Sequence, residues 1–554
     1  MLKKLFNRKK ICTNHIKIIR SSILLVLVLL TPIVVLAQNS EEVITENTDT
    51  VVNYIEVIDN NEEIIDIGKG MEIMPNLEGA SFETNDQKDP QKRSLFRANS
   101  ISEDTPQSVS YVAGGLFWGH LKGTSGTTVD IWKEYSDATA FTYIEPTTNS
   151  SGVVPILGEK GDYYKIAISG MTGWIHKNTM NITPFVPSGH YNYYRRNAEG
   201  DLIHYINTVG GKNNYAAINQ GEAPSYFSGD QYYISFDGMY FYQPTEAGFR
   251  NMINNYNAGT RTNSINANNP YINYFQWLPA RTQSTLTTAD MEKYLTKNGT
   301  DNNTQMRSRL YQTSQFFVNN ANLYGSNHGL AFANAIHESQ WGQSGMAKNR
   351  NNFFGHAAYD SSPGSANVYA SADIGIANHY ARFLNWNYLD TDPKYSTYNG
   401  GSVGNKAVGM NVKYASDPYW GEKIASHYYN MDKMAGKKDY KRYTLGTVKT
   451  AGSKVYKEAR ANSGSPYNVK HSGITVAILN TIKEGSNTWY QFTSDPVLDS
   501  NKNPLTWKKD LSLLWTKVNY AKSHLYINSN DVTIVSQGSN SKLLPQTNPT
   551  SKTP

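Results

Sequence analysis

The sequence predicts a multidomain protein in which a mostly helical α+β domain is flanked by small all-β domains. Its 554 residues exceed the usual size of a single domain. Apolar residues recur at helical spacing through much of 246–435. Short alternating runs, bounded by turn residues, fill 105–245 and 442–535 instead. The two kinds of pattern predict domains of different class.

The first 37 residues are predicted to be a signal peptide rather than part of a fold. Seven Lys and Arg residues, with no acidic residue, precede an apolar run over 23–36, and a small-residue cleavage site ends at Ala37. The alternative is an uncleaved membrane anchor, but the apolar run is short for a span and acidic sequence follows it. We therefore expect an exported protein that is not an integral membrane protein after cleavage.

The charge of the rest of the chain is divided unevenly. Residues 38–104 hold 16 acidic and 5 basic residues, which predicts a flexible linker or prosegment. Residues 105–554 hold 40 basic and 30 acidic residues, which suits a polyanionic partner. Nucleic acid is the weaker interpretation, because no tight Lys/Arg cluster follows residue 37. Cys12 is the only cysteine, so the mature chain has no disulfide, thiolate nucleophile or Cys-based zinc site.

Residues 105–187 are predicted to form a small β barrel, because apolar runs near 128–132, 152–157 and 163–168 have strand spacing. Residues 188–245 are rich in tyrosine, and Asp237-Gly238 marks a hairpin turn. Those tyrosines could line a binding groove or form the core of a small β module, and the sequence favours neither.

Residues 246–435 are predicted to hold the main helices, and residues 349–371 a loop lobe between them. The predicted helices open at Thr288 and cover 305–323, 328–341, 373–384 and 420–434. Residues 442–535 return to strand-like runs, which predicts a second barrel followed by a polar tail over 536–554. In that barrel Trp515 to Tyr520 loosely repeats the Gly173-Trp-Ile ending of the first barrel.

The stretch with the most chemical content runs from Gly329 to Gly355. An apolar helical stripe places Glu338 at a helix end, next to the aromatic residues Trp341 and Phe353. We expect this apolar setting to raise the pKa of the Glu338 carboxyl, so that it can donate a proton near neutral pH. The simpler interpretation is a surface glutamate that ends a helix.

Four motifs in this region resemble the glucosaminidases of glycoside hydrolase family 73, which hydrolyse peptidoglycan. They are Ala335-Ile-His-Glu338-Ser-Gln-Trp341-Gly342, Asn351-Asn-Phe-Phe-Gly355, Tyr359-Asp360, and Tyr414-Ala-Ser-Asp417-Pro418, and they occur in the family's order over about 90 residues. Pneumococcal-type members carry wall-binding β modules before the catalytic domain. The resemblance covers 246–435 best, and the endings of the β domains resemble bacterial SH3-like wall-binding domains.

The resemblance implies a lysozyme-like α+β catalytic domain at 246–435, flanked by SH3-like barrels at 105–187 and 442–535. It implies a secreted endo-β-N-acetylglucosaminidase that acts on peptidoglycan glycan strands, with teichoic acids as further wall ligands and roles in wall remodelling, cell separation or autolysis. Glu338 would be the general acid, and no cofactor is implied.

The second catalytic group stays open. Asp373 and Asp360 are the candidate carboxylates, with helix capping and a turn as their simpler roles. The 2-acetamido group of the substrate could also attack, as in substrate-assisted families. Tyr414 matches a tyrosine implicated in activity. The candidate substrate-contacting residues are Trp341, Phe353, Phe354, Tyr359 and His356.

Other chemistries fit the sequence less well. His337-Glu338 begins like a zinc-protease motif, but Trp341 stands where the second histidine would be. Residues 400–404 match Gly-x-Ser-x-Gly but follow no apolar strand. The alternatives that remain are a muramidase or lytic transglycosylase of the same fold, and a wall-binding adhesin without activity.

Overall fold

A computed structural model describes residues 57–58, 64–65, 114–123, 127–146, 152–208, 215–298, 308–356, 366–392, 397–506 and 511–539. The chain divides into two compact units, Met1–Pro75 and Asn76–Pro554. In the first unit, β1 (Val57–Ile58) pairs antiparallel with β2 (Ile64–Ile65). The predicted signal peptide and most of the predicted acidic linker lie outside the described residues. No helix among those described is long and apolar enough to cross a membrane.

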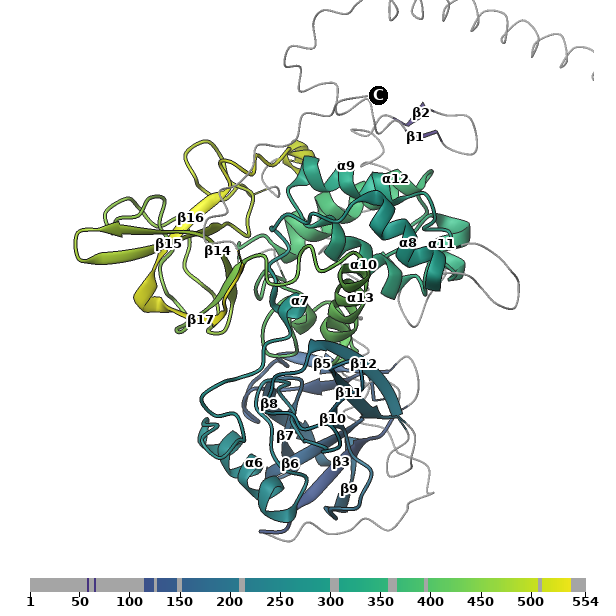
Figure 1. Cartoon of the computed structure of the whole chain (residues 1–554), viewed down its shortest axis with the longest axis vertical. Coiled ribbons are helices and arrows are strands. Elements are labelled where there is room, and N and C mark those ends of the chain that lie inside the picture. Colours follow the sequence, from purple (N-terminus) through teal and green to yellow (C-terminus); the bar gives the residue numbers. More distant parts are fainter. Residues whose placement is uncertain are drawn as a thin grey trace, which may run out of the picture. The chain divides into compact units, whose positions relative to one another are not determined.

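The second unit begins with an antiparallel β domain (Figure 1). Its main sheet has the order β8-β7-β6-β3-β9, and β4 pairs with β5 beside it. The buried positions alternate along β8, because side chains on a strand face opposite sides in turn. The strands are β3 (Phe117–Leu121), β4 (Val129–Ile131), β5 (Thr142–Ile144), β6 (Val153–Lys160), β7 (Tyr163–Ile168), β8 (Met171–His176) and β9 (Met180–Pro184).

The tyrosine-rich module is a three-stranded sheet of β10 (Tyr193–Arg196), β11 (Asp201–Asn207) and β12 (Tyr215–Glu222). The tyrosines in and next to this sheet form two groups. One set is buried with Leu202 and Phe227 and comprises Tyr194, Tyr233 and Tyr271. The other set surrounds Tyr193, whose ring lies 4.7–5.1 Å from those of Tyr205, Tyr232 and Tyr215. Tyr232 is 44% exposed, so this second set reaches the surface.

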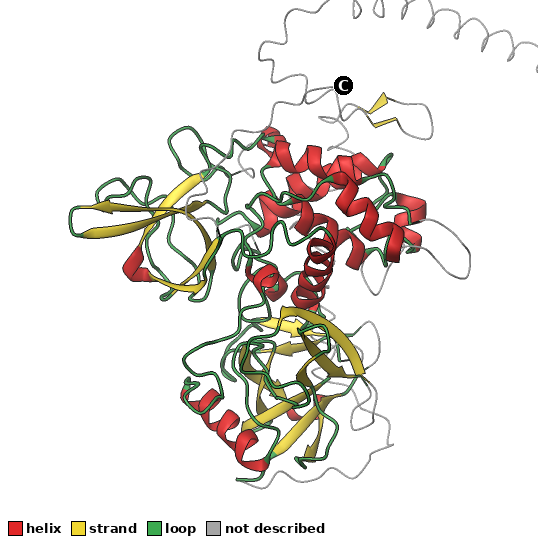
Figure 2. Ribbon diagram, in the orientation of Figure 1, coloured by secondary structure: helices red, strands yellow, loops and turns green. Residues whose placement is uncertain are grey.

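Most helices gather in one region, separate from the two groups of strands, but α6 (Glu246–Ala258) lies beside the first β domain and packs against β6 (Figure 2). After α6 come α7 (Tyr274–Trp277), α8 (Thr288–Asn298), α9 (Ser314–Tyr324), α10 (His328–Glu338), α11 (Gly345–Arg350), α12 (Ala372–Asn378), the π-helix η3 (His379–Tyr388), η4 (Met410–Val412) and α13 (Trp420–Met434). The predicted helix 420–434 is confirmed at both ends. The predicted helix 373–384 is a short α-helix continued by a π-helix.

The C-terminal β domain repeats the topology of the first. Its sheet has the order β16-β15-β14-β13-β17, so in both five-stranded sheets the last strand pairs with the first and a single 3₁₀ turn precedes it. The strands are β13 (Thr444–Val448), β14 (Thr475–Glu484), β15 (Asn487–Thr493), β16 (His524–Asn528) and β17 (Val532–Ser536). The predicted match of 515–520 to the end of the first domain is wrong, because the fourth strand is β16 and Trp515 lies in the 3₁₀ turn η6 (Leu511–Trp515). In both described sheets the edge strands stay unpaired with each other, so barrel closure is not established.

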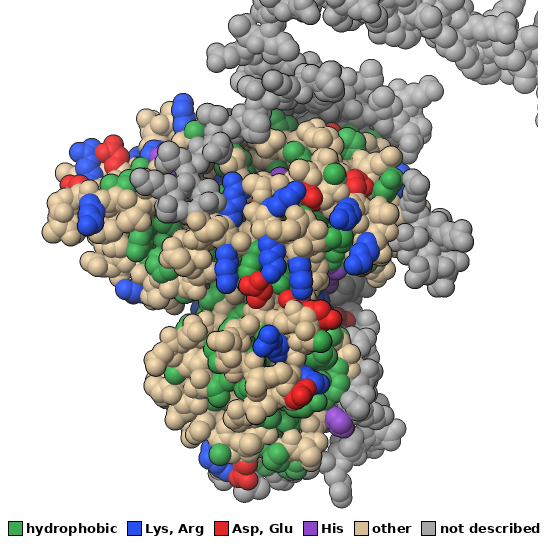
Figure 3. Space-filling model, viewed as in Figure 1, with side chains coloured by type: hydrophobic (Ala, Val, Ile, Leu, Met, Phe, Trp, Pro, Cys, Tyr) green, Lys and Arg blue, Asp and Glu red, His purple; other side chains and the backbone are tan. Residues whose placement is uncertain are grey.

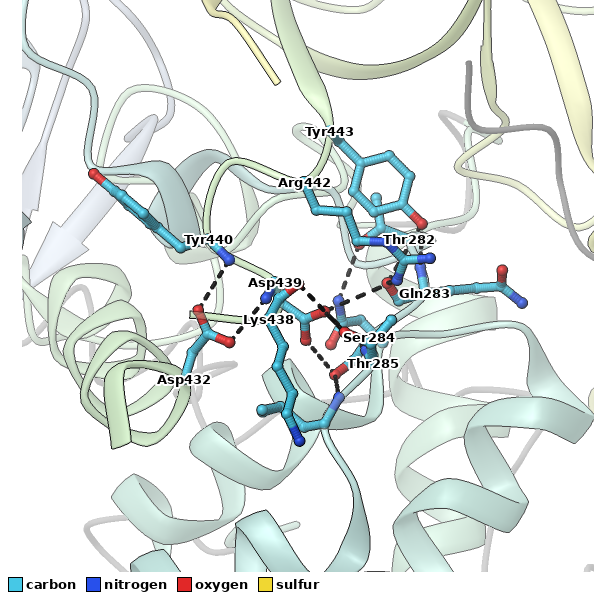
Figure 4. A network of polar contacts seen from close by, with 12 residues as sticks. Thr282, Gln283, Ser284, Thr285, Asp432, Lys438, Asp439, Tyr440, Arg442 and Tyr443 are labelled. Atoms are coloured by element: carbon cyan, nitrogen blue, oxygen red, sulfur yellow. Dashed lines mark hydrogen bonds and ion pairs between the residues drawn. The ribbon is translucent and has the colours of Figure 1, made fainter. Parts of the chain in front are cut away.

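A short connector, residues 435–443, joins α13 to the C-terminal domain and is fixed by buried carboxylates (Figure 4). Asp432 accepts hydrogen bonds from the backbone N–H groups of Asp439 and Tyr440, at 2.8 and 2.9 Å. The Asp439 carboxylate accepts from Ser284 and Thr285, at 2.5–2.8 Å. Because both carboxylates are bound by several donors, the connector holds one conformation. Burial raises the pKa of Asp432 to about 6.

Two ion pairs link the connector and α13 to neighbouring elements. Lys438 pairs with Asp290 of α8 at 2.6 Å, and Lys433 pairs with Asp201 of β11 at 2.6 Å. On the face shown in Figure 3, basic and acidic side chains lie beside one another. The more exposed Lys438–Asp290 pair contributes at most about 1 kcal/mol, whereas the Asp201 carboxylate of the other pair is buried. The two ion pairs favour one relative orientation of the elements that they join more than they add to the stability of the fold.

Arg281 is the buried link between the helices and the C-terminal domain. Its guanidinium is fully buried and donates to the carbonyls of Tyr324 and Gly325 on one side and of Ser494 and Asp495 on the other, at 2.7–3.1 Å. Burial lowers its pKa to about 10, which still leaves it charged at neutral pH. One side chain thus satisfies carbonyls from two domains.

We predict that Arg281→Met lowers the melting temperature by about 6 °C or more, because several buried carbonyls lose their donor at about 1–3 kcal/mol each. Differential scanning calorimetry measures this. Arg250→Met is the matched control, because Arg250 is exposed on α6 and pairs with the exposed Glu246. Equal shifts for the two variants would contradict the role given to Arg281.

Candidate active site

The end of α10 gives Glu338 its position. Ser339 Oγ donates to the carbonyl of Ala335 and accepts from the N–H of Gly342, at 2.5 and 2.8 Å, which closes the helix. Gln340, Trp341 and Gly342 then follow with φ of 51°, 62° and 74°. A left-handed conformation is unfavourable for a bulky residue. The chain therefore turns sharply, and Glu338 is the last helical residue, half-buried.

Glu338 is held by a tryptophan that the sequence analysis did not select. The indole Nε1–H of Trp420, the first residue of α13, donates to Glu338 Oε1 at 2.6 Å. Trp420 is 2% exposed, so the packing around its ring fixes the direction of this bond. The available signal was that Trp420 lies two residues after the Tyr414–Pro418 motif, at a predicted helix start. Its pairing with residue 338 is a long-range contact that no local pattern encodes.

Tyr414 joins the same group. Its ring stacks on Trp420 with centroids 4.3 Å apart and an interplanar angle of 22°, and it is 3% exposed. The predicted residues Glu338 and Tyr414 are therefore brought together through Trp420. A carboxyl fixed by a neighbouring indole can direct its proton at one place.

Behind Tyr414 lies a buried chain of polar side chains. Asn334 Nδ2 is 3.5 Å from Tyr414 Oη and 3.5 Å from His379 Nε2, both long contacts. His379 Nδ1 lies 3.2 Å from His356 Nε2, and His356 Nδ1 lies 2.8 Å from the hydroxyl of Tyr369. Burial lowers the pKa of His379 to about 3 and that of His356 well below its usual value. Both imidazoles are therefore neutral at neutral pH.

The predicted aromatic walls separate into two groups. Phe353 and Phe354 are fully buried, and Phe354 stacks on His379 at 3.6 Å, so neither ring offers a face to a sugar in this conformation. His356 is also buried, stacked on Phe383 at 3.6 Å. Trp341 is half-buried, and its ring lies within about 5 Å of those of Tyr294 and His427. Tyr359 lies outside the described residues.

Of the two candidate second carboxylates, only Asp373 lies within the described residues, and its hydrogen-bond partner is outside this group. Asp373 lies in the first turn of α12, where Asn320 Nδ2 of α9 donates to its Oδ1 at 2.8 Å. Burial raises the pKa of Asp373, although the Asn320 hydrogen bond opposes this. Asp360 lies outside the described residues. Within the described residues, no group of three or more His, Cys, Asp or Glu side chains could hold a metal ion.

One family model and two pneumococcal proteins match part of the chain. Residues 314–433 match the family model Glucosaminidase, described as mannosyl-glycoprotein endo-beta-N-acetylglucosaminidase. Two Streptococcus pneumoniae proteins, each named "Putative endo-beta-N-acetylglucosaminidase", are 45% identical over 108 residues. That is 19% of this chain, and the match spans only 15% and 14% of the two pneumococcal proteins.

Solved structures of S. aureus autolysin E are also similar. The complex with the muropeptide NAM-L-ALA-D-iGLU is 18% identical and covers 30% of this chain and 75% of that chain, with a TM-score of 0.22. A catalytic mutant in complex with the disaccharide NAG-NAM is 17% identical, covers 29% and 73%, and has the same TM-score. The segment that matches the family model, 314–433, contains Glu338, Asp373, Tyr414 and Trp420, and the resemblance that its motifs predict is confirmed by the family model and the pneumococcal relatives.

Proposed function

We propose that the protein is an endo-β-N-acetylglucosaminidase that hydrolyses the β-1,4 bond between GlcNAc and MurNAc in peptidoglycan, with Glu338 as the general acid. The observation that supports this most is the hydrogen bond from Trp420 to Glu338, inside the segment that matches the glucosaminidase family model. A carboxyl fixed at one oxygen keeps its proton directed at one place, which general acid catalysis requires. Protonation of the glycosidic oxygen then lets the leaving sugar depart.

For the second group, we propose the 2-acetamido group of the bound GlcNAc rather than Asp373. The carboxylate of Asp373 is engaged by Asn320 and lies at the N-terminus of α12, where a carboxylate is favoured by the helix dipole. This placement supports a structural role. The acetamido oxygen would attack the anomeric carbon, and Tyr414 would orient it through its hydroxyl.

The remaining parts of the proposal concern the location of the enzyme. Residues 1–37 would direct export, and the protein would then act at the bacterial cell wall in remodelling, cell separation or autolysis. The two β domains of equal topology would be SH3-like and bind the wall, teichoic acids included, which raises the local substrate concentration. The net positive charge of residues 105–554 supports attraction to an anionic wall.

The decisive experiment digests purified peptidoglycan with residues 38–554 and identifies borohydride-reduced products by mass spectrometry. We expect reduced GlcNAc ends, a loss of about 10²–10⁴-fold in rate for Glu338→Gln, and at most a tenfold loss for Asp373→Asn. Reduced MurNAc ends would indicate a muramidase, and 1,6-anhydro ends a lytic transglycosylase. Wall binding without product release would favour an adhesin. Equal losses for both variants would make Asp373 the second group.

The role of Trp420 can be separated from its packing. Trp420→Phe keeps an aromatic ring against Tyr414 but removes the N–H that fixes Glu338. We expect kcat to fall about 10–100-fold with KM nearly unchanged, because the acid loses its orientation. Steady-state kinetics on soluble glycan fragments measure this. Trp489→Phe, in the C-terminal β domain, is the matched control, and a similar loss there would refute the assignment.

The two stacked histidines give a pH prediction. The folded-state pKa values of His356 and His379 lie below the unfolded value of about 6.5. As the pH falls through 6.5, the unfolded chain therefore binds more protons than the folded chain does. Their contribution to stability is full above pH 6.5 and is lost progressively below it. We expect ¹⁵N spectra of labelled histidine to show both rings neutral at pH 5. An imidazolium signal from either ring at that pH would contradict their burial in the folded protein.

A further inference from the structure

The loop that carries Tyr414 is held by a neighbouring domain. Two side chains of β5, in the first β domain, form hydrogen bonds with it. Thr142 Oγ1 donates to the carbonyl of Val412 at 2.8 Å, and the Tyr143 hydroxyl donates to the carbonyl of Lys413 at 3.0 Å. Thr142 and Tyr143 are both 1% exposed. The two residues directly before Tyr414 are thus fixed by side chains about 270 residues away in sequence.

The same domain binds the far side of the loop. The N–H of Glu145 donates to the carbonyl of Ser416 at 3.0 Å, and Ser169 Oγ donates to the carbonyl of Pro418 at 2.5 Å. Ser169 lies in the tight turn between β7 and β8 with a φ of 43°. The first β domain therefore supplies a donor on each side of Tyr414.

A buried lysine just before the loop supplies two more donors. Lys406 is fully buried, and its ammonium donates to the carbonyls of Asn411 and Ala415, the former at 3.0 Å. It also lies 5.2 Å from the centre of the Tyr143 ring, which is a favourable cation–π position. Six carbonyls between residues 411 and 418 are thus satisfied by Lys406 and the first β domain together. A buried carbonyl that loses its donor costs about 1–3 kcal/mol, so the loop depends on these contacts.

We propose that the first β domain is a positioning element of the active site. Thr142, Tyr143 and Ser169 fix the backbone of the 411–418 loop, the loop fixes Tyr414, and Tyr414 packs on the Trp420 that orients Glu338. The catalytic part of this inference rests on the proposed function. The domain would therefore set the turnover number of the enzyme, independently of any ligand that it binds.

The test is the full chain with Thr142→Val and Tyr143→Phe, which keep shape and remove both hydroxyl donors. The matched control is Thr179→Val with Tyr191→Phe. Thr179 and Tyr191 also donate to backbone carbonyls, at 2.6 and 2.7 Å, but those carbonyls belong to His176 and Pro187, away from the loop. Hydrogen exchange by mass spectrometry reports on residues 410–418, steady-state kinetics on kcat and KM, and sedimentation with insoluble peptidoglycan on wall binding.

We expect exchange in 410–418 to become about tenfold faster in the test variant and not in the control. We also expect kcat to fall about tenfold or more with KM within about twofold, and wall binding to stay unchanged. Restoring the hydroxyl as Thr142→Ser in the Tyr143→Phe background should recover part of the kcat.

Two results would overturn the proposal: loop exchange equal to that of the control, or a raised KM with unchanged kcat, which would make the domain a substrate-binding element. The exchange measurement needs no activity. If the unaltered chain releases no sugar, the proposed function fails, and loop exchange still decides whether the domain holds the loop. If the double variant does not fold, Tyr143→Phe alone is compared with Tyr191→Phe by the same measurements.

Discussion

The packing of α13 is the constraint on which the other parts of the structure depend. Its first residue, Trp420, binds Glu338 at the end of α10, and its Tyr428 lies against Gly329 at the start of α10, so the two helices run antiparallel. A Cβ at position 329 would come within 2.7 Å of the Tyr428 ring, which explains why glycine stands there. The helix thus sets both ends of the helix that carries the candidate acid.

The same helix organises the neighbouring domains through buried polar contacts. Glu422 of α13 accepts from Gln220 of β12 at 3.0 Å and contacts His204 of β11 at 2.8 Å. Asp432, near the other end, fixes the connector to the C-terminal domain. Such contacts are costly to break one partner at a time, because each leaves a buried polar group unpaired. The tyrosine-rich sheet and the connector are thus both attached to the helix whose first residue binds Glu338.

The sequence predicted what local patterns encode. The helix 420–434, the helix that carries Glu338, and the strand-rich character of both flanking domains follow from hydrophobic periodicity and turn residues. Three features could not be predicted in this way. The indole of Trp420 meets Glu338 across 82 residues. Phe353, Phe354 and His356 were predicted to contact the substrate, but their side chains are buried. The fourth strand of the C-terminal domain is β16, because pairing with β15 outweighs the weak sequence echo at Trp515.

The backbone directly after Glu338 is strained, which indicates that the geometry of this site is maintained at a cost in stability. Gln340 and Trp341 both adopt left-handed conformations, each of which costs about 1–3 kcal/mol for a residue that is not glycine. Gly342 completes the turn, where a Cβ would lie 2.5 Å from Ser308 Oγ. A longer helix would avoid this strain, whereas the observed turn places the Trp341 ring within about 5 Å of those of Tyr294 and His427. The strained turn therefore keeps the candidate acid terminal on its helix and an aromatic ring close by, as expected where a functional site is maintained against the preference of the chain.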